Sequence, residues 1–445
     1  MTTQMLTNYK NTIDWDNSPS LDANHSYNQA FVYDAMLCET ALQNGVLSRI
    51  KSRQRGSSGN RPMQITKPDA TVESYTYNKA GLLETVHAQV KGTTSVLAVT
   101  NINYNEKGQR TEIYYGNGSK TKYEYDKETF RLNRLLTTRN TGIDILQDIN
   151  YTYDPVGNIT QITDNAQQTH YYNNSVIAPT GAYTYDALYR LKTATGRELT
   201  SLQMPSNTDF VDNIALPNTA SNAMQNFTQQ YEYDELGNMM EMKSNGNWTR
   251  DYYYDFANNT NRLLVHTENV TEYTYDAHGN MLSMPHLASM LWDYKDELKE
   301  VDLGGGGTAY YVYDVGGERV RKVIEKTGGI VEERVYLGGF EVYRKSVAGT
   351  LDFERETLHV SDDQKKIVSI ETKTMENATS IQNSAPSIRY QYDNHLGSAA
   401  LELDDTAAII SYEEYHPFGT TSYRSGRTET EVSLKRYKYV GKLQP

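Results

Sequence analysis

Short stretches in which aromatic and polar residues alternate recur along this chain of 445 residues. In each stretch two tyrosines stand two positions apart, and an Asp or Asn follows the second one. Successive side chains of a β-strand point to opposite faces, so the two rings share one face of a strand. The pattern predicts an all-β chain in which strand exceeds helix by a wide margin.

The phrase Tyr-x-Tyr-Asp, often followed by x-x-Gly-Asn, is an internal repeat. From 234 to 314 its last residue returns about every 20 positions. Further copies are Tyr252 to Asp255 and, more weakly, Tyr104-Asn105 and Trp292 to Lys295. The structural positions of the motif are Tyr75, Tyr77, Tyr123, Tyr125, Asp126, Tyr151, Tyr153, Asp154, Gly157, Tyr183, Tyr185, Asp186, Tyr231, Tyr233, Asp234, Gly237, Tyr273, Tyr275, Asp276, Gly279, Tyr311, Tyr313, Asp314, Tyr390, Tyr392, Asp393 and Gly397.

One repeat predicts a strand, a turn and a second strand. The Asp caps the turn with its side chain, and the Gly or Asn supplies the positive φ that closes a hairpin. Apolar residues return after the turn, as at Leu191 and Leu282. A lone hairpin is marginal in water, so neighbouring repeats are expected to pair into an extended β-sheet joined by tyrosine ladders. Replacing Asp154, Asp234 or Asp276 with Ala is expected to lower stability without removing a binding activity.

Composition changes the picture of the core. Of the aromatic residues 37 are Tyr, 8 are Phe and 3 are Trp, and hydrophobic residues make up 38%. Compact domains use roughly 45–50% apolar residues, so we do not expect this chain to form a single large apolar core. A ring whose hydroxyl needs a partner suits a sheet surface that is only partly dry. Both the wall of a hollow shell and an exposed binding face fit this property.

Charge and cysteine content exclude several classes. The 43 basic residues are outnumbered by 56 acidic ones and form no long run, so nucleic acid is not an expected partner. No window approaches 18 apolar residues, and the first ten residues lack the pattern of a standard signal peptide, so no membrane span is expected. Cys38 is the only cysteine, which excludes an internal disulfide and a cysteine metal site.

The repeats divide the chain into segments. Within the first segment, residues 33–42 fit either a short helix or an irregular strand. The expected segments are an N-terminal part at 1–70, the repeat array at 71–345 with a Pro-, Asn- and Ser-rich loop at about 199–229, C-terminal hairpins at 346–442 with a loop at 375–387, and a tail at 443–445. From residue 308 onward longer hairpin strands are expected at 310–313, 318–325, 330–337, 340–345 and 351–360.

Candidate chemistry is weak throughout. The run Gly304 to Gly307 lacks the Lys-Ser/Thr of a phosphate loop and is better explained as a hairpin connection. Asp-x-x-Gly-Asn lacks the alternating carboxylates of an EF-hand, and the histidines show no ligand pair. The acid pairs 362–363 and 404–405 are better explained as solvated turns than as a catalytic dyad. We expect no catalytic residue, no metal site and no cofactor.

Taken together, the motifs resemble those of Rhs and YD-repeat proteins, and the match is closest to the C component of bacterial insecticidal toxin complexes. The similarity extends over about residues 70–442. The residues that carry it are Trp292 to Lys295 with Val301 to Asp314, Tyr336-Leu-Gly-Gly-Phe-Glu-Val-Tyr343, and Tyr390 to Ser398 followed by Ile409 to Gly419, which resembles the start of the Rhs-associated core domain.

The resemblance implies a β-strand ribbon that spirals around a hollow interior and encloses a toxic polypeptide until delivery. It implies two protein partners, namely an upstream toxin-complex component that completes the shell and the enclosed cargo. It also implies a bacterial protein made in the cytoplasm and released with a toxin complex. In relatives the core continues beyond the equivalent of Lys442 to the aspartates that cut the chain, and no residue here matches them. We therefore expect a non-enzymatic shell segment whose open rims favour self-association.

Two alternatives come from other classes. Rows of exposed tyrosines suit sugar faces, so a carbohydrate-binding or adhesive β-array is the first alternative. Inward, mutually stacked rings favour the shell, whereas rings facing outward in a groove favour the sugar. The second alternative is the remnant of a self-cleaving aspartic protease, for which an intact mass after long incubation would be the contrary result.

Overall fold

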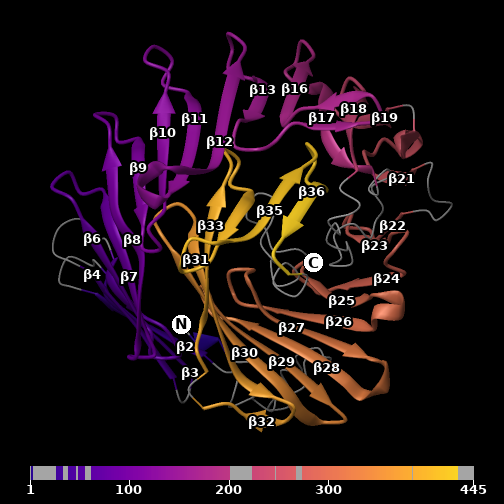
Figure 1. Ribbon diagram of the computed structural model, residues 1–445. Helices are drawn as coiled ribbons and strands as arrows, with labels where there is room; N and C mark the ends of the chain where they lie inside the picture. Colours follow the sequence, from indigo (N-terminus) through magenta and orange to yellow (C-terminus); the bar gives the residue numbers. More distant parts are fainter. Residues whose placement is uncertain are drawn as a thin grey trace. The chain divides into compact units, whose positions relative to one another are not determined.

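The computed structural model describes residues 2–3, 27–33, 39–46, 49–55, 62–200, 223–245, 247–266, 273–382 and 384–428, with side chains from residue 63 onward. The described residues form β-strands and turns and contain no α-helix, which confirms the all-β prediction (Figure 1). Short 3₁₀ turns stand at η1 (Asn140–Gly142), η3 (Phe256–Asn258), η4 (Gly304–Gly306) and η5 (Thr327–Gly329).

The chain divides into two compact units, each built from segments distant in sequence. The first contains residues 1–102 and 287–388, and the second contains 103–286 and 389–445. The chain passes from one unit to the other within strands β8 (Thr94–Tyr104) and β33 (Ser387–Asp393) and between residues 286 and 287. The segments predicted from the sequence are continuous stretches of the chain, whereas each of these units groups strands that contact one another.

The first unit consists of antiparallel strands that pair mostly with their neighbours in sequence. Its two runs are β2 to β7 and β24 to β31. The bounds are β1 (Thr2–Thr3), β2 (Tyr27–Tyr33), β3 (Glu39–Val46), β4 (Arg49–Arg55), β5 (Pro62–Thr66), β6 (Val72–Tyr77), β7 (Leu83–Val90), β24 (Ser289–Trp292), β25 (Leu298–Asp302), β26 (Thr308–Tyr313), β27 (Arg319–Lys326), β28 (Ile330–Tyr336), β29 (Phe340–Val347), β30 (Thr350–Ser361), β31 (Lys366–Glu376) and β32 (Thr379–Ser380).

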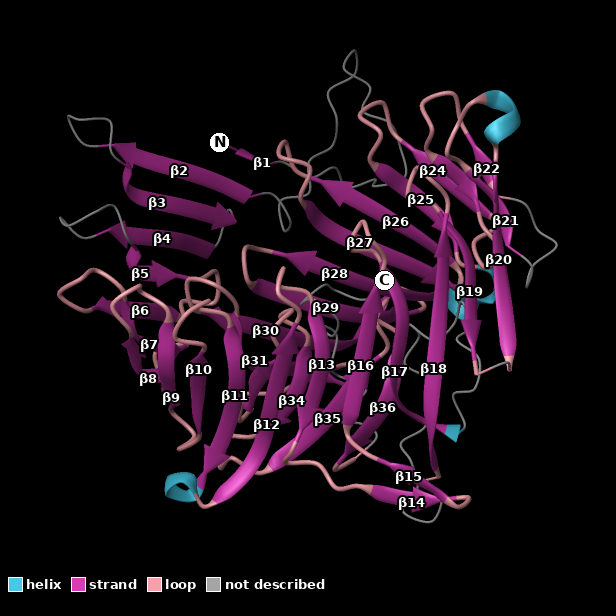
Figure 2. Cartoon of the chain, turned by 90° about the horizontal axis from the view of Figure 1, so that it is seen from above, coloured by secondary structure: helices cyan, strands magenta, loops and turns pink. Residues whose placement is uncertain are grey.

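The second unit contains most of the tyrosine repeats, and strands β9 to β18 run side by side in Figure 2. Strand β13 pairs with β16, so the small hairpin β14–β15 is set aside from the ladder. The bounds are β9 (Arg110–Tyr115), β10 (Lys120–Tyr125), β11 (Leu132–Arg139), β12 (Asp144–Tyr153), β13 (Ile159–Asp164), β14 (His170–Tyr172), β15 (Ser175–Ile177), β16 (Thr180–Tyr185), β17 (Leu191–Leu199), β18 (Met224–Tyr233), β19 (Met239–Ser244), β20 (Trp248–Tyr254), β21 (Leu263–His266), β22 (Thr274–Tyr275), β23 (Met281–Ser283), β34 (Ala399–Leu403), β35 (Ile409–Tyr415) and β36 (Thr421–Gly426).

Each repeat forms its hairpin with the same local irregularity. In the hairpin β12–β13, Thr152 pairs with Gln161 but Tyr153 pairs with Ile159, so one residue bulges next to the turn. The same shift precedes the second tyrosine at Tyr77, Tyr125, Tyr185, Tyr233, Tyr254, Tyr275 and Tyr313. A bulge bends and twists a strand, and its recurrence gives every repeat the same exit from the turn.

The apolar core is distributed in small clusters along the array. One cluster joins Leu135, Ile149 and Tyr151, and another joins Ala194, Tyr231, Met242 and Trp248. In the second unit, the hairpins β33 to β36 add aromatic contacts to the array. Tyr392 packs edge-on against Tyr115 with ring centroids 4.9 Å apart.

Two sequence-based boundaries need correction. The loop expected at about 199–229 is shorter, because β18 already begins at Met224 and pairs with β17 through residue 230. In the segment 33–42, strand β3 begins at Glu39 and the described part holds strand, so the helix alternative is wrong there; residues 34–38 lie outside the described residues. The strands expected after residue 308 are confirmed, with ends shifted by at most two residues.

Candidate functional site

The repeated turn is the best-defined local structure of the chain. In the turn that follows Tyr153, Asp154 Oδ1 accepts the backbone N–H groups of Gly157 at 2.7 Å and Asn158 at 2.8 Å. Asn158 returns its side-chain amide to Asp154 Oδ2 at 2.8 Å. The reciprocal Asp–Asn contact recurs at Asp234 with Asn238 and at Asp276 with Asn280. These contacts are the capping role that the sequence predicts.

The turn carboxylates are held in their charged form. The pKa of Asp276 lies below its usual range because the Asn280 side chain and backbone N–H groups donate to it. Hydrogen bonds from backbone Thr129 and Arg190 lower the pKa of Asp126 and Asp186 in the same way. At Asp154 and Asp234 burial opposes the shift, but the Asn side chain and the turn N–H groups outweigh it.

In several repeats the second tyrosine binds the preceding hairpin. Tyr153 Oη donates to the carbonyl of Leu132 at 2.6 Å, and Leu132 is the first strand residue after the previous turn. Burial raises the pKa of Tyr153, which keeps its hydroxyl a donor. Equivalent bonds join Tyr125 to Arg110, Tyr185 to Ile159, Tyr254 to Met239, Tyr275 to Leu263 and Tyr415 to Ala399.

An arginine at the end of one turn binds the next. Arg131 Nη1 donates to the carbonyl of Asp154 at 3.0 Å, and its guanidinium lies 5.7 Å from the ring of Tyr153. Arg190 likewise donates to the carbonyl of Asp234 at 2.7 Å and lies 4.9 Å from the ring of Tyr233. The repeat is therefore a contact unit in which tyrosine reaches backward and arginine reaches forward.

The first tyrosine of the motif faces the core to varying depth. Tyr75, Tyr151 and Tyr231 are buried, with at most 8% of their surface exposed. Tyr123, Tyr183, Tyr273 and Tyr311 are partly buried, as are the second tyrosines. The second tyrosines of the motif contact a neighbouring strand. In most copies the residue between the two tyrosines is the one that faces outward.

Two copies of the motif are shifted relative to the sequence interpretation, one by one residue and the other by two residues in the opposite direction. At the C-terminal copy the turn is capped by Asn394, whose Oδ1 accepts the N–H groups of Leu396 and Ser398, while Asp393 is buried within β33. The bulge lies between Tyr392 and Asp393, so Asp393 occupies the place of the second tyrosine. Gly397 closes this turn with a φ of 77°. The assignment of Asp393 as the turn cap is therefore wrong.

The same correction applies to the weak copy at 292–295. Asp293 caps this turn, with its Oδ1 accepting the N–H of Lys295 at 2.8 Å. The bulge lies between Leu291 and Trp292, so Trp292 takes the place of the second tyrosine. In both copies the order Tyr-Asp predicts the capping residue less well than does the distance from the cap to the residue that closes the turn.

A buried polar network fastens the C-terminal hairpins to the array of the second unit. The Arg197 guanidinium, on β17, binds the Glu414 carboxylate of β35 through its Nε at 3.0 Å. Tyr412 Oη donates to Asp164 Oδ2 at 3.1 Å. Burial, together with Glu414, raises the pKa of Asp164. Its other oxygen accepts the N–H groups of Asp148 and Ala166.

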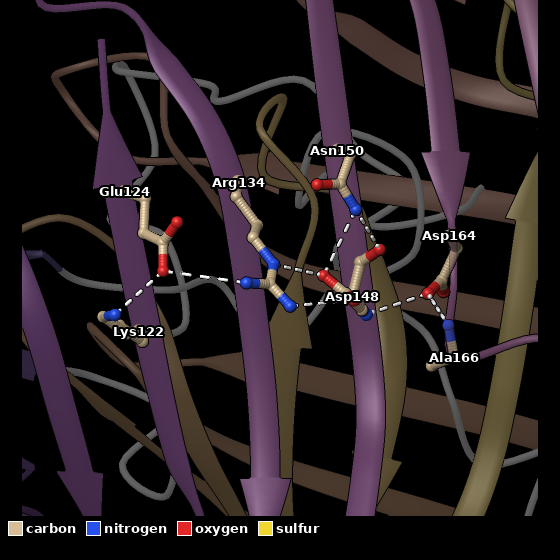
Figure 3. Close-up of polar contacts among 7 residues, drawn as sticks. All are labelled: Lys122, Glu124, Arg134, Asp148, Asn150, Asp164 and Ala166. Carbon is tan, nitrogen blue, oxygen red and sulfur yellow. Dashed lines mark hydrogen bonds and ion pairs between the residues drawn. The ribbon is translucent and has the colours of Figure 1, made fainter.

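The network continues across strands β10 to β13 as a row of alternating charges (Figure 3). Arg134 lies between Glu124 and Asp148, with its Nε 2.6 Å from Asp148 Oδ1. Asn150 donates to the same carboxylate at 3.2 Å. Opposite charges that face each other across strands stabilise the register of a sheet.

Two histidines belong to this interface. His416 Nε2 lies 3.0 Å from Glu198 Oε2, and both side chains are buried. His395 packs edge-on against Tyr151, with ring centroids 4.8 Å apart. Burial lowers the pKa of His395 to about 4. Its Nδ1 is buried and has no hydrogen-bond partner among the described residues.

A cavity of about 500 Å³ lies between the array and these hairpins. Its wall includes Asp164, Arg197, Glu414 and both histidines of the interface. Among the polar side chains that line it, Arg197 binds Glu414 and Tyr412 binds Asp164.

The remaining sequence candidates fall into structural roles. The run Gly304 to Gly307 connects β25 to β26, and Asp302 accepts the N–H of Gly304. Asp362 and Asp404 cap turns, and Arg427 binds Asp404 at 2.8 Å. Among the described residues no group of three or more His, Cys, Asp or Glu side chains could hold a metal ion. No helix within the described ranges is long and apolar enough to cross a membrane.

Sequence reasoning missed the contacts between repeats. The arginine that precedes the second strand at 131, 190 and 262 is visible in the sequence, but its partner lies in the next turn. The polar interface of the C-terminal hairpins has no sequence signal, because Glu198 and His416 are separated by more than two hundred residues.

The tyrosine hairpins and the contacts between them form a repeat β-sheet of the kind that the resemblance to YD-repeat proteins implies. The chain is homologous to the toxin subunits YenC1 and YenC2 of Yersinia entomophaga, which confirms the resemblance to toxin-complex C components. Identity to YenC1 is 30% over 87% of this chain and 41% of the relative, and to YenC2 it is 30% over 82% and 39%. The chain thus spans about two fifths of the length of these relatives. No family model matches.

Solved structures share the fold. The complex of TcdB2 and TccC3 matches with a TM-score of 0.81 and 25% identity, covering 100% of this chain and 23% of the matched chain. Its form TcdB2-TccC3-TEV matches with a TM-score of 0.82 and 25% identity over 96% of this chain and 22% of the matched one. The Photorhabdus luminescens Tc holotoxin pore matches with a TM-score of 0.78 and 26% identity over 94% and 20%. The chain is thus similar in sequence and fold to components of toxin complexes, over part of their length.

Proposed function

We propose that this chain is a non-enzymatic wall segment of a toxin complex and that it helps to enclose a polypeptide cargo. The observation that carries the proposal is the similarity to TcdB2-TccC3 at a TM-score of 0.82 over 96% of the chain. The contacts between repeats support it, because a wall needs identical joints from one hairpin to the next. A second protein of the TcdB2 type is the proposed partner, and release with the complex is the proposed location.

The tyrosines favour a wall over a sugar-binding face. The hydroxyls of second-position tyrosines such as Tyr153 and Tyr275 donate hydrogen bonds to backbone carbonyls of the neighbouring repeat. First-position rings such as that of Tyr231 are buried. Aromatic side chains that bind sugars need accessible faces, which the buried first-position rings do not offer. Incubation followed by intact mass measurement tests the remaining alternative of self-cleavage, and a stable 50.6 kDa species is expected.

Enclosure is tested by protease protection. A protease-sensitive reporter polypeptide is appended after Pro445 and the chain is co-expressed with a TcdB2-like component. The reporter is expected to survive protease only when both proteins are present. The matched control appends the same reporter to a folded protein unrelated to the complex. Equal cleavage of the reporter with and without the partner would contradict the proposal.

A further inference from the structure

A cluster of positive charge lies on one face of the first unit, on strands β26 to β29. Lys322 pairs across strands with Tyr311 on one side and with Arg334 on the other, and Arg334 pairs in turn with Tyr343. The Arg319 guanidinium stands between two rings, 5.6 Å from the centroid of Tyr311 and 5.1 Å from that of Tyr336. The strand register therefore brings Arg319, Lys322 and Arg334 together among tyrosine rings. We call Arg319, Lys322 and Tyr336 the cation site.

Several other cations of this sheet are paired with glutamates. Arg321 binds Glu333, Arg344 binds Glu354, and Arg334 binds Glu341. Lys326 binds Glu332 at 2.6 Å, so that carboxylate is already engaged.

Lys322 and Arg319 depart from this pattern. Neither makes a hydrogen bond or an ion pair with any residue in the described part of the chain, and their recorded contacts are with tyrosine rings. Burial and the neighbouring guanidinium groups of Arg319 and Arg334 lower the pKa of Lys322 to about 8. The Glu332 carboxylate acts on Lys322 in the opposite direction, but it also binds Lys326, so Lys322 lies among more cations than anions.

An unpartnered donor stands beside these cations. The hydroxyl of Tyr336 is buried and has no hydrogen-bond partner among the described residues. A buried hydroxyl without a partner costs free energy, and most such groups in proteins are satisfied. A ligand oxygen that accepted from Tyr336 while facing Arg319 and Lys322 would satisfy the hydroxyl and neutralise the charge together.

We propose that the cation site binds a carboxylate group carried by a polypeptide. A carboxylate fits because it is the group that pairs with the other cations of the same sheet, and it accepts from ammonium, guanidinium and hydroxyl donors alike. The site goes beyond the wall function. Only the assignment of the carboxylate to an enclosed cargo rests on the proposed function, whereas binding itself requires only the first unit.

Fluorescence anisotropy of a labelled oligoglutamate peptide with the full chain tests the site, and oligoglutamine serves as the neutral probe. Oligoglutamate is expected to bind and oligoglutamine is not. Lys322→Gln is expected to weaken binding about tenfold, as loss of one charge-assisted hydrogen bond implies. Lys295→Gln, at an exposed turn lysine of the same unit, is the matched control and should leave binding unchanged.

Tyr336→Phe separates binding from folding. The substitution removes only an unpartnered hydroxyl, so the urea midpoint should stay constant or rise while oligoglutamate binding weakens several-fold. Unchanged affinity in both Lys322→Gln and Tyr336→Phe, or equal binding of the two peptides, would overturn the proposal. Inorganic phosphate is the competing arm, and phosphate that binds more tightly than oligoglutamate would overturn the assignment to a polypeptide. A reporter without acidic residues keeps the enclosure test independent, because its protection does not require this site.

Discussion

The hydroxyl of Tyr153 donates to the backbone carbonyl of Leu132 across 2.6 Å, and this bond ties one tyrosine hairpin to the hairpin before it. It explains why the chain uses tyrosine where phenylalanine would fill the same space. The ring packs at the hairpin end, and the hydroxyl donates to a carbonyl next to the bulge of the preceding hairpin, where Leu132 pairs with Tyr125.

Tyr153→Phe is therefore expected to lower the free energy of unfolding by about 0.5–1.5 kcal/mol, the usual net contribution of one hydrogen bond. Urea unfolding followed by fluorescence measures the change. Tyr171→Phe is the matched control, because Tyr171 is 79% exposed and should shift stability by less than about 0.5 kcal/mol. Equal effects at both positions would mean that the hydroxyl of Tyr153 contributes nothing.

Two turn glycines make a matched pair. Both have positive φ, 111° at Gly157 and 94° at Gly237, so Ala is strained at either one. A Cβ at Gly157 would lie 2.8 Å from Arg131 Nη2, whereas one at Gly237 meets nothing within 4 Å. Gly157→Ala should therefore cost more than Gly237→Ala, by about 1 kcal/mol for the hydrogen bonds that Arg131 loses. In an Arg131→Ala background the difference should vanish, and its persistence would refute the explanation.

The buried His395 predicts a dependence of stability on pH. Its pKa falls from 6.5 to about 4 on folding because burial disfavours the charged form. Protons then bind the unfolded chain more tightly, so stability is fully present above pH 6.5 and is lost as the pH falls towards 4. The loss should reach about 3 kcal/mol at the acid end of this window.

Urea titrations between these pH values measure the effect. His395→Leu should flatten this part of the profile, and His278→Gln, at an exposed turn, should leave it unchanged. A profile that is identical in the His395 variant and the parent chain would exclude this histidine as the origin.

Arg197 is the main polar anchor of the C-terminal hairpins. Its side chain is 3% exposed, it binds Glu414, and its Nη1 donates to the carbonyl of Gln168 at 3.0 Å. Arg197→Met should cost about 3–5 kcal/mol, because it leaves the Glu414 carboxylate without its partner beside Asp164. Limited proteolysis is expected to cut first in β35 and β36. Arg427→Gln, at an exposed ion pair, is the control, and equal protease resistance of all three proteins would contradict this role.

The sequence predicts the hairpins well because their determinants are local. Alternation fixes the face of Tyr151 and Tyr153, and the cap at Asp154 requires only residues up to Asn158. The shifted copy at Asp393 shows the limit of this reasoning. Asp and Asn both cap turns, so in the order Tyr-Asp-Asn only the bulge and the closing Gly397 reveal which one does so.

The interface of the C-terminal hairpins is harder to predict for a different reason. Glu198 and His416 meet only after the array and the hairpins have folded, and neither stands in a distinctive motif. The orphan hydroxyl of Tyr336 is equally invisible, since a single sequence does not tell a paired tyrosine hydroxyl from an unpaired one. Contacts between distant segments leave no periodic trace in a single sequence.

The backward bonds of tyrosines such as Tyr153 and the forward bonds of arginines such as Arg131 constrain how such a chain can change its length. Removing or duplicating a whole hairpin places a new Tyr opposite an old carbonyl and a new Arg opposite an old turn, so the joints re-form. Removing a single strand reverses the direction of every strand that follows and leaves such donors without acceptors. Arrays of this kind can therefore lengthen or shorten in steps of one hairpin, and recombination adjusts their length in whole units.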